Sequence, residues 1–339
     1  MADSPNPLLA GLLPEVSRSF YLSLRALPKS VRPQIGVAYL LARTTDTIAD
    51  TDLVPVEQRL HALQALRERI QGNGASPLDF GDLTRHQGAP AERALLEKCE
   101  SSLALLHTLP MMDRSLVREV LEIITSGQEL DLRRFAGAAH GRIVALRTDA
   151  ELDDYTYRVA GCVGEFWTKL CRVRVFPKAQ IEDSFLLKKA VQFGKGLQLV
   201  NILRDLPADL RNGRCYLPDE KLAPAGITSA DLLQPANESR LRPVYAAYLD
   251  RAAAGLADGW IYTNALPWPQ MRVRLACAWP ILIGLKTIAR LRTANPLDPQ
   301  QRVKISRREV RRLILKSVLL YPWPAAWRSL VPESHRADS

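Results

Sequence analysis

The stretch GKGLQLVNILRDLPADLRNGRCYLP, residues 194–218, decides how this chain folds. Its leucine, valine and isoleucine residues recur at the spacing of an α-helix and predict a substantially buried helix. Polar residues at intervals of 3, 4 and 4 share one face of that helix: Gln198, Asn201, Asp205 and Asp209. Pro207 lies between the two aspartates and has no N–H for the carbonyl of Leu203, so we expect a kink or a helix break there.

A second stretch, YLLARTTDTIADT at residues 39–51, repeats this pattern. If it is helical, its polar residues again share one face: Tyr39, Arg43, Asp46 and Asp50. Like charges on a largely buried helix are costly unless they share a cation. The four carboxylates of the two D-x-x-x-D pairs, facing one another, would form a hard-oxygen site suited to Mg²⁺. Taken alone, the first pair could equally be solvated aspartates at a helix end.

Three arginines near these aspartates are candidate clamps for phosphate, because a guanidinium forms forked hydrogen bonds with phosphate oxygens. They are Arg43, Arg204 and Arg214. The alternative for each is an ion pair with the same aspartates at the surface.

The remaining sequence indicates an all-α chain with one domain. Its 339 residues are 47% hydrophobic and 24% charged, which excludes disorder as the main state. Helical spacing of apolar residues recurs along the chain, and two-residue alternation is hard to find. We expect a flexible N-terminus over residues 1–15, a catalytic domain over 16–317 and a C-terminal tail over 318–339.

No apolar run approaches the roughly 20 residues of a membrane-spanning helix, and no basic segment precedes the short apolar patch near the N-terminus. We therefore expect a cytoplasmic protein. The five cysteines are odd in number and include no C-x-x-C pair, so neither a disulfide framework nor a zinc ribbon is expected.

The charge of +10 lies entirely in the last 69 residues, where 14 basic residues face 4 acidic ones. Such a basic end can meet anionic lipid, nucleic acid or a phosphorylated ligand, or it can be a solvated face. We expect peripheral contact with a membrane surface through basic residues and interfacial aromatic residues: Arg311, Arg312, Lys316, Arg328, Tyr321, Trp323 and Trp327. The alternative is that these tryptophans pack on the domain as part of an ordinary last helix.

Further motifs give the chain a family resemblance. SRSF at residues 17–20 and YTYRVAGCVGE at residues 155–165 accompany the two aspartate motifs and GRCYLP. In this order the motifs resemble the squalene and phytoene synthases, which join two prenyl diphosphates head to head. The resemblance implies an isoprenoid-synthase-type helical fold around a central cavity and ionisation of an allylic diphosphate.

Site residues carried over from the family are as follows. Catalysis is assigned to Tyr155, Asp46, Asp50, Asp205 and Asp209. Substrate binding is assigned to Ser19, Phe20, Tyr39, Arg43, Gln198, Asn201, Arg204, Arg214 and Tyr216. Mg²⁺ is assigned to Asp46, Asp50, Asn201, Asp205 and Asp209. Many members carry an acid where this chain has Ala49, so metal ligation in the first motif rests on Asp46 and Asp50 alone.

Two further elements are similar to those of squalene synthases, a C-A-x-P element at residues 277–280 and a V-K-I segment at residues 303–305. The resemblance assigns both to NADPH, with Cys277, Pro280, Lys304 and Arg307 as the cofactor-binding residues. A solvated helix face is the alternative for the basic cluster.

The resemblance therefore implies a farnesyl-diphosphate farnesyltransferase of squalene synthase type. It would condense two farnesyl diphosphates through presqualene diphosphate and reduce the product with NADPH. The alternatives are a dehydrosqualene, phytoene or presqualene diphosphate synthase that lacks the reduction and, from another class, a non-catalytic basic protein of membranes or nucleic acid. We expect a monomer that does not bind nucleic acid.

Overall fold

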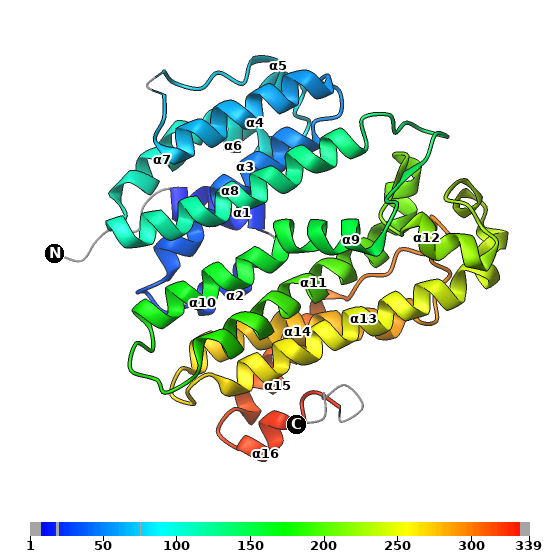
Figure 1. The fold of residues 1–339 in the computed structure, drawn as a ribbon. Coiled ribbons are helices and arrows are strands. Elements are labelled where there is room, and N and C mark those ends of the chain that lie inside the picture. The colour runs from blue at the N-terminus through cyan, green and yellow to red at the C-terminus, as the bar shows by residue number, and fades with distance from the viewer. Residues whose placement is uncertain (1–7, 18–19, 75, 333–339) are drawn as a thin grey trace. The chain divides into compact units, whose positions relative to one another are not determined.

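The computed structural model describes residues 8–17, 20–74 and 76–332 and confirms the all-α class (Figure 1). Its elements group into two compact units. The first unit comprises the chain up to Arg133 together with Phe166–Lys178, and the second comprises Arg134–Glu165 together with the chain from Ala179 onward.

The first unit is built around helix α3, whose leucines Leu40 and Leu41 are completely buried. Its elements are η1 (Leu8–Leu12), α1 (Leu13–Ser17), α2 (Phe20–Ala26), α3 (Arg32–Asp50), α4 (Val56–Gln71), α5 (Gly81–His86), α6 (Pro90–Glu97), α7 (Cys99–Thr108) and most of α8 (Met111–Arg134). The N-terminal segment differs from the expected flexible stretch. From Leu8 onward it is helical, because Leu12 and Leu13 have a core to pack against and are 4% and 3% exposed.

The second unit is built around α11 and the helices that pack on it. Its elements are β1 (Val144–Ala145), α9 (Asp149–Thr156), the π-helix η2 (Tyr157–Gly161), α10 (Cys162–Arg174, which continues into the first unit), α11 (Asp183–Arg211), β2 (Arg214–Cys215), α12 (Asp219–Leu222), the short 3₁₀ turns η3 (Ala223–Ala225), η4 (Ala230–Leu233) and η5 (Pro235–Asn237), α13 (Glu238–Ala265), α14 (Met271–Leu291), α15 (Arg307–Leu320) and α16 (Pro324–Arg328).

Glycines let the neighbours of α11 approach its backbone. A Cβ atom on Gly196 would lie 2.9 Å from the Cα of Gly255 in α13, and a Cβ on Gly194 would lie 2.3 Å from the carbonyl oxygen of Ala160 in η2. No side chain fits at either crossing without moving backbone. These contacts fix α11 against α13 and η2 just before the stripe of polar residues begins.

A short parallel pairing holds the loop after α11. Val144 of β1 pairs with Arg214 of β2, and Ala145 pairs with Cys215. Gly213 precedes β2 with a φ of 79°, a conformation that glycine adopts without steric cost, and a Cβ there would lie 2.5 Å from the backbone of Ala139. The pairing therefore sets the direction of Arg214 and the residues that follow it.

The end of the described chain packs into the second unit, which corrects the expected tail. Trp327 is completely buried and Tyr321 is 5% exposed, because both contribute aromatic rings to a cage around the guanidinium of Arg274. Arg274 lies 4.7 Å from the ring centre of Trp268 and donates a 2.6 Å hydrogen bond to the carbonyl of Leu266. The prediction that Tyr321 and Trp327 contact a membrane surface is therefore wrong. Trp323, by contrast, is 62% exposed.

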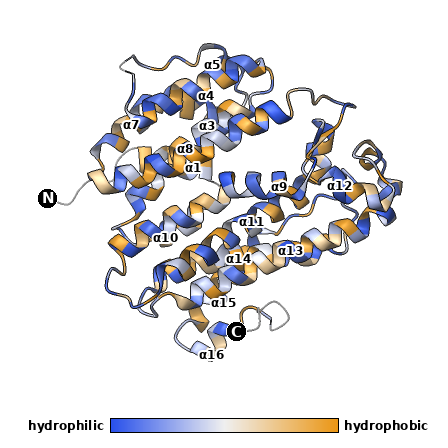
Figure 2. Cartoon of the chain, viewed as in Figure 1, coloured by the Kyte–Doolittle hydropathy of each residue, from blue (hydrophilic) through white to orange (hydrophobic). Residues whose placement is uncertain are grey.

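Hydropathy varies from helix to helix (Figure 2), and α9 is mostly hydrophilic. Among the residues that the structure describes, no helix combines the length and the apolar character needed to cross a bilayer.

Candidate functional site

The first aspartate motif occupies the open face of α3. Twelve of the 19 residues of this helix are buried. The four residues that were singled out by their spacing are more accessible. Tyr39, Arg43 and Asp46 are half-buried, and Asp50 is exposed. Ala49, at the place where many family members carry an acid, is instead among the buried residues. The predicted polar face is thus the face that the fold leaves accessible.

Arg43 ties this face to a neighbouring helix. Its guanidinium donates hydrogen bonds to Asp46 on α3 and to Glu92 on α6. Burial by itself lowers the pKa of Arg43, but the two carboxylates outweigh it and raise the pKa. The ion pair with an aspartate, which the sequence left open as the alternative for this arginine, is the arrangement in the structure.

Three residues that support the first motif escaped the sequence analysis. Gln128 of α8 donates a 3.3 Å hydrogen bond to Asp46, and Glu92 anchors Arg43. Arg59 of α4 is 6% exposed and donates a 2.7 Å hydrogen bond to the carbonyl of Ala49 near the end of α3. A polar residue within a buried helix stripe was the available signal for Gln128, but no sequence pattern identifies its partner.

The second aspartate motif occupies the open face of α11. Leu199, Leu203 and their apolar neighbours are buried, as the pattern predicts. The polar residues are accessible: Gln198, Asp205 and Asp209 are half-buried, and Asn201 is exposed. The helix break expected at Pro207 is not observed, because α11 runs unbroken from Asp183 to Arg211.

Arg204 pairs with its own neighbour, Asp205. Nε and one Nη donate to the two carboxylate oxygens at 3.0 and 2.5 Å. The hydrogen bond that Arg204 donates to Asp205, opposed by partial burial, raises the pKa of Arg204. Here too the structure has the ion pair that the sequence left open as an alternative.

Two tyrosines from separate motifs meet in the second unit. The rings of Tyr155 in α9 and Tyr216 after β2 stack with their centres 4.9 Å apart, and their hydroxyl groups are 3.5 Å apart. Phe135 packs edge-on against Tyr216 at 5.1 Å. Directly after α9 the chain forms the π-helix η2, a distortion often found at functional sites. The structure therefore brings together the predicted catalytic Tyr155 and the predicted substrate-binding Tyr216.

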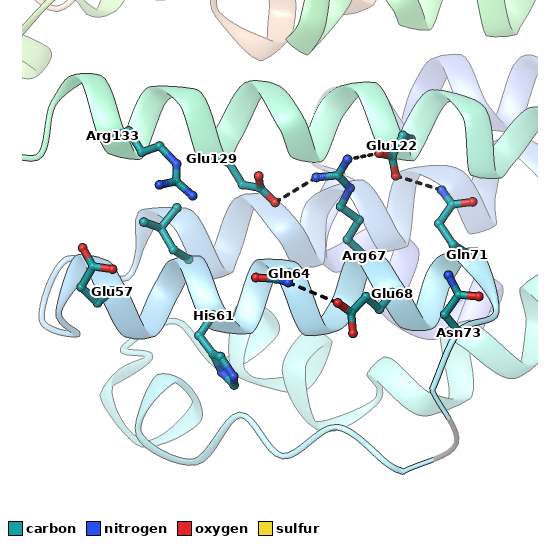
Figure 3. A pocket seen from close by; sticks show the side chains of 11 residues that line it. Glu57, His61, Gln64, Arg67, Glu68, Gln71, Asn73, Glu122, Glu129 and Arg133 are labelled. Atoms are coloured by element: carbon teal, nitrogen blue, oxygen red, sulfur yellow. Dashed lines mark hydrogen bonds and ion pairs between the residues drawn. The ribbon is translucent and has the colours of Figure 1, made fainter.

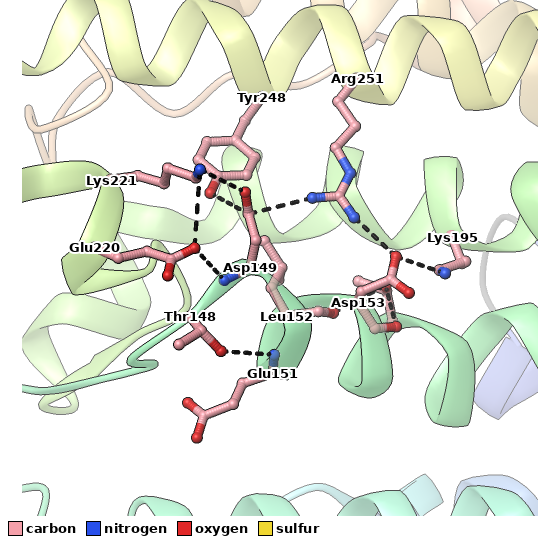
Figure 4. A network of polar contacts seen from close by, with 11 residues as sticks. Thr148, Asp149, Glu151, Leu152, Asp153, Lys195, Glu220, Lys221, Tyr248 and Arg251 are labelled. Atoms are coloured by element: carbon pink, nitrogen blue, oxygen red, sulfur yellow. Dashed lines mark hydrogen bonds and ion pairs between the residues drawn. The ribbon is translucent and has the colours of Figure 1, made fainter.

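A polar network fixes α9 close to Tyr155 (Figure 4). Asp153 pairs with Lys195 of α11 at 2.6 Å and with Arg251 of α13 at 2.8 Å. Asp149, at the start of α9, accepts a 2.6 Å hydrogen bond from Tyr248 of α13. No sequence pattern predicts this network, because its members lie on different helices and share no motif.

The other predicted substrate-binding residues are less well defined. The hydroxyl of Tyr39 donates a 3.3 Å hydrogen bond to the carbonyl of Val16. Arg214 is half-buried in β2. Ser19 and the side chain of Phe20 lie outside the described residues, so their assignments stay predictions.

The four predicted cofactor residues fall into two groups along an antiparallel helix pair. Trp279 of α14 donates a 3.0 Å hydrogen bond to Ser317 of α15, close to Cys277 and Pro280. Arg290, about 15 Å further along α14 at 1.5 Å per residue, donates to the carbonyl of Lys304 at 2.5 Å.

Accessibility separates these two groups. Cys277 is 4% exposed and Pro280 is half-buried, whereas Lys304 and Arg307 are exposed. Lys304 and Arg307 are therefore the two that are open to a ligand.

The carboxylates of the two aspartate motifs could supply a metal with two protein ligands, but they do not form a complete protein site. Within residues 8–17, 20–74 and 76–332, no three His, Cys, Asp or Glu side chains gather as a complete protein site for a metal would. Protein Mg²⁺ sites commonly use one or two carboxylates and take the remaining ligands from water and substrate phosphates. Half-buried aspartates such as Asp46 and Asp205 fit that kind of site.

A pocket in the first unit has a different character (Figure 3). It lies along α4 and α8, has a volume of about 750 Å³ and is lined almost entirely by polar and charged side chains. Arg67 bridges Glu122 and Glu129 across it. Such walls do not suit a prenyl chain, so this pocket is not our candidate for the reaction site.

Comparison with known proteins agrees with the motifs. The squalene/phytoene synthase family model matches residues 13–309. A presqualene diphosphate synthase of Rhodopseudomonas palustris is 34% identical over 239 residues, which are 70% of this chain and 72% of that protein. A squalene synthase of Schizosaccharomyces pombe is 25% identical over 313 residues, 91% of this chain and 64% of that one.

Solved structures share the fold. A structure of TcSQS with the ligand E5700 matches with a TM-score of 0.76 at 21% identity, covering 97% of this chain and 98% of that one. Squalene synthase HpnC from Alicyclobacillus acidocaldarius matches with a TM-score of 0.60 at 22% identity, covering 85% and 93%. The family match spans nearly the whole chain and includes both open aspartate faces. This chain belongs to the squalene/phytoene synthase family.

Proposed function

We propose that this protein is a squalene synthase that condenses two farnesyl diphosphates and reduces the product. Its family acts on prenyl diphosphates. The observation that carries the proposal is the pair of D-x-x-x-D motifs, each at accessible positions of a helix whose neighbouring apolar residues are mostly buried. Carboxylates kept accessible in this way are available to a metal diphosphate.

The chain's own residues suggest how the reaction proceeds. Arg43 and Arg204 would each turn from its aspartate to a substrate diphosphate, since phosphate oxygens accept the same forked hydrogen bonds as a carboxylate. The stacked rings of Tyr155 and Tyr216 would present an aromatic surface to the allylic cation left behind and would help to exclude water. When bound, Mg²⁺ would neutralise diphosphate charge and NADPH would supply the hydride of the final reduction.

Two observations support the reductive step, the length of the match to a squalene synthase and two exposed cations. The squalene synthase of S. pombe matches over 91% of this chain, against 70% for the presqualene diphosphate synthase of R. palustris. Lys304 and Arg307 are exposed cations that suit a dinucleotide phosphate. The segment that carries them is held by Arg290, which donates to the carbonyl of Lys304 and to Glu309.

The second candidate is a presqualene diphosphate synthase, favoured by the higher identity of 34% to that enzyme. Product analysis decides between the two. Purified protein is incubated with farnesyl diphosphate and Mg²⁺, with and without NADPH. Squalene formed only with NADPH supports the proposal. Presqualene diphosphate as the sole product under both conditions overturns the reductive step, and no consumption of substrate overturns the proposal altogether.

The enzyme would also work at an anionic membrane surface, because its C15 substrate and C30 product partition into lipid. The outward side of α15 and the residues after it carry four exposed apolar side chains: Leu315 (59%), Val318 (37%), Leu319 (58%) and Trp323 (62%). Exposed cations lie among them: Arg311, Arg312, Lys316 and Arg328. Each cation near an anionic surface contributes at most about 1 kcal/mol.

Point substitutions test this surface better than truncation, because removing residues from 318 onward would also remove buried Trp327. The triple variant Leu315→Ser, Leu319→Ser, Trp323→Ser should sediment less with vesicles containing phosphatidylserine, and salt should release the wild type. Met111→Ser, Met112→Ser removes exposed methionines (79% and 58%) in the first unit and is the matched control. Equal sedimentation of the triple variant and the control would rule out this surface.

A further inference from the structure

Pro207 creates a local problem inside the second aspartate motif. It lies within α11, between Asp205 and Asp209. A proline has no N–H, so the carbonyl four residues earlier, that of Leu203, has no helical donor. Leu203 is 1% exposed, and an unpaired buried carbonyl costs free energy comparable to a lost hydrogen bond.

A tyrosine from the next helix supplies the missing donor. The hydroxyl of Tyr245 in α13 donates a hydrogen bond of 2.9 Å to the carbonyl of Leu203. This length is normal for a phenol donor. Tyr245 is completely buried, and its ring lies 5.9 Å from the guanidinium of Arg242. Burial raises the pKa of Tyr245, which keeps the phenol protonated and able to donate.

This bond is one of a series of contacts along α11 and α13. Lys189 pairs with Asp258 at 2.5 Å, and the backbones of Gly196 and Gly255 meet as described above. Rising numbers on α11 meet falling numbers on α13, so the two helices are antiparallel and Tyr245 lies at the end of the contact nearest the aspartates. The contact between Gly196 and Gly255 holds α11 before the motif. The hydrogen bond from Tyr245 holds the backbone of α11 directly beside the motif.

We propose that Tyr245 is a positioning residue for the metal-binding aspartates, because its hydroxyl replaces the helix hydrogen bond that Pro207 removes. The bond keeps α11 continuous through residues 203–209, so that Asp205 and Asp209 stay one turn apart on the accessible face. Without it, the helix is free to bend at Pro207 and the two carboxylates separate. This inference rests on the proposed role of these aspartates in holding Mg²⁺ and diphosphate.

A double-mutant cycle tests the inference. Tyr245→Phe removes only the hydroxyl, and Pro207→Ala restores an N–H to the Leu203 carbonyl. We expect Tyr245→Phe to weaken the binding of Mg²⁺ with inorganic diphosphate about tenfold by calorimetry and to lower the midpoint of urea unfolding without ligand. In the Pro207→Ala background, both effects of Tyr245→Phe should largely disappear. Pro207→Ser serves the same purpose if the alanine variant is poorly soluble.

Tyr248→Phe is the matched control, because it also removes a phenol of α13 but one bonded to Asp149. Its effects should be the same in both backgrounds. Equal effects of Tyr245→Phe with proline and with alanine at position 207 would overturn the inference. Asp205→Asn distinguishes this failure from that of the proposed function: if it leaves binding of Mg²⁺ and diphosphate unchanged, the metal role itself is wrong, whereas the metal-free unfolding cycle still tests the hydrogen bond.

Discussion

In α3 a residue of another helix, Gln128, contacts an aspartate side chain of the motif, whereas in α11 another helix donates a hydrogen bond to the backbone of the motif. Arg43 and Gln128 both contact the carboxylate of Asp46. Around the second pair, the contacts with other helices include a glycine crossing and the hydrogen bond from Tyr245 to a main-chain carbonyl. The same spacing of aspartates is therefore maintained in two ways. Asp46 is held in part by a side chain of another helix, whereas Asp205 pairs with Arg204 of its own helix and depends on the path of that helix.

The largest expected effect tests whether the two pairs are equivalent in chemistry despite this difference. Asp46→Asn and Asp205→Asn should each lower turnover of farnesyl diphosphate about 10²- to 10³-fold, because each removes charge that would hold the metal diphosphate. Thermal unfolding should change little. Asp52→Asn, an exposed neighbour of the first motif, is the control and should remain close to wild type. Near-normal turnover in either motif variant contradicts the assignment.

The next prediction concerns stability and should distinguish α11 from α3. Gly196→Ala in α11 forces a Cβ against the backbone of Gly255 and should lower the free energy of unfolding by about 1–3 kcal/mol. Gly36→Ala in α3 meets side-chain ends rather than backbone, those of Leu9 at 2.9 Å and Leu13 at 3.3 Å, and alanine favours a helix by up to about 1 kcal/mol over glycine. Urea unfolding should therefore show a loss for the first variant and little change or a gain for the second. Equal losses of unfolding free energy in the two variants would contradict this difference between α11 and α3.

Substitutions of the two motif arginines should also differ in their effect on the free energy of unfolding, but by a smaller amount. Arg43 joins two helices through Asp46 and Glu92, and a lysine ammonium cannot reproduce that fork. Arg43→Lys should cost about 1–2 kcal/mol of unfolding free energy. Arg204 pairs with the adjacent Asp205 and is itself exposed, so Arg204→Lys should cost a few tenths of a kcal/mol. Chemical unfolding measures both, and a larger loss for the Arg204 variant would reverse the comparison.

The smallest expected effect is a pH dependence of stability at Glu309. This residue is contacted both by a backbone N–H and by side chains. Its carboxylate accepts hydrogen bonds from the Ser306 backbone and from Arg290, and it pairs with Lys286. The bond from Lys286, followed by that from the Ser306 backbone, lowers the pKa of Glu309. A lowered pKa means that the stabilising contribution is complete above the ordinary glutamate pKa of about 4.3 and is lost as pH falls through the folded value.

The control is Glu309→Gln, which cannot titrate. Between pH 5 and pH 3, the urea midpoint of wild type should therefore fall more steeply than that of the variant. Parallel curves would mean that Glu309 makes no such contribution.

Helix faces could be predicted from the sequence, and contacts between distant residues could not. The interval of polar residues along α3 and α11 was sufficient to identify their accessible faces, because helix geometry alone sets which residues share a side. Of the kink or break expected at Pro207, the break does not occur, and the donor to the Leu203 carbonyl lies 42 residues further along the chain in another helix. Gln128 is likewise 82 residues from Asp46.

The aromatic residues near the C-terminus show a second limit. Tyrosine and tryptophan suit both a bilayer interface and a protein core, so residue type did not separate the buried Tyr321 and Trp327 from the exposed Trp323. The cage around Arg274 makes the difference, and no pattern in the sequence pairs that arginine with rings some 50 residues later.

The same cage gives the protein an optical signature. Trp260 and Trp327 stack with ring centres 5.2 Å apart, and Trp268 meets Trp327 edge-on at 6.5 Å. Transition dipoles of indoles this close couple strongly, so the cluster should dominate the near-ultraviolet circular dichroism of a chain with six tryptophans. Loss of that band with the far-ultraviolet helix signal intact would report release of the last helical turn while the rest of the molecule stays folded.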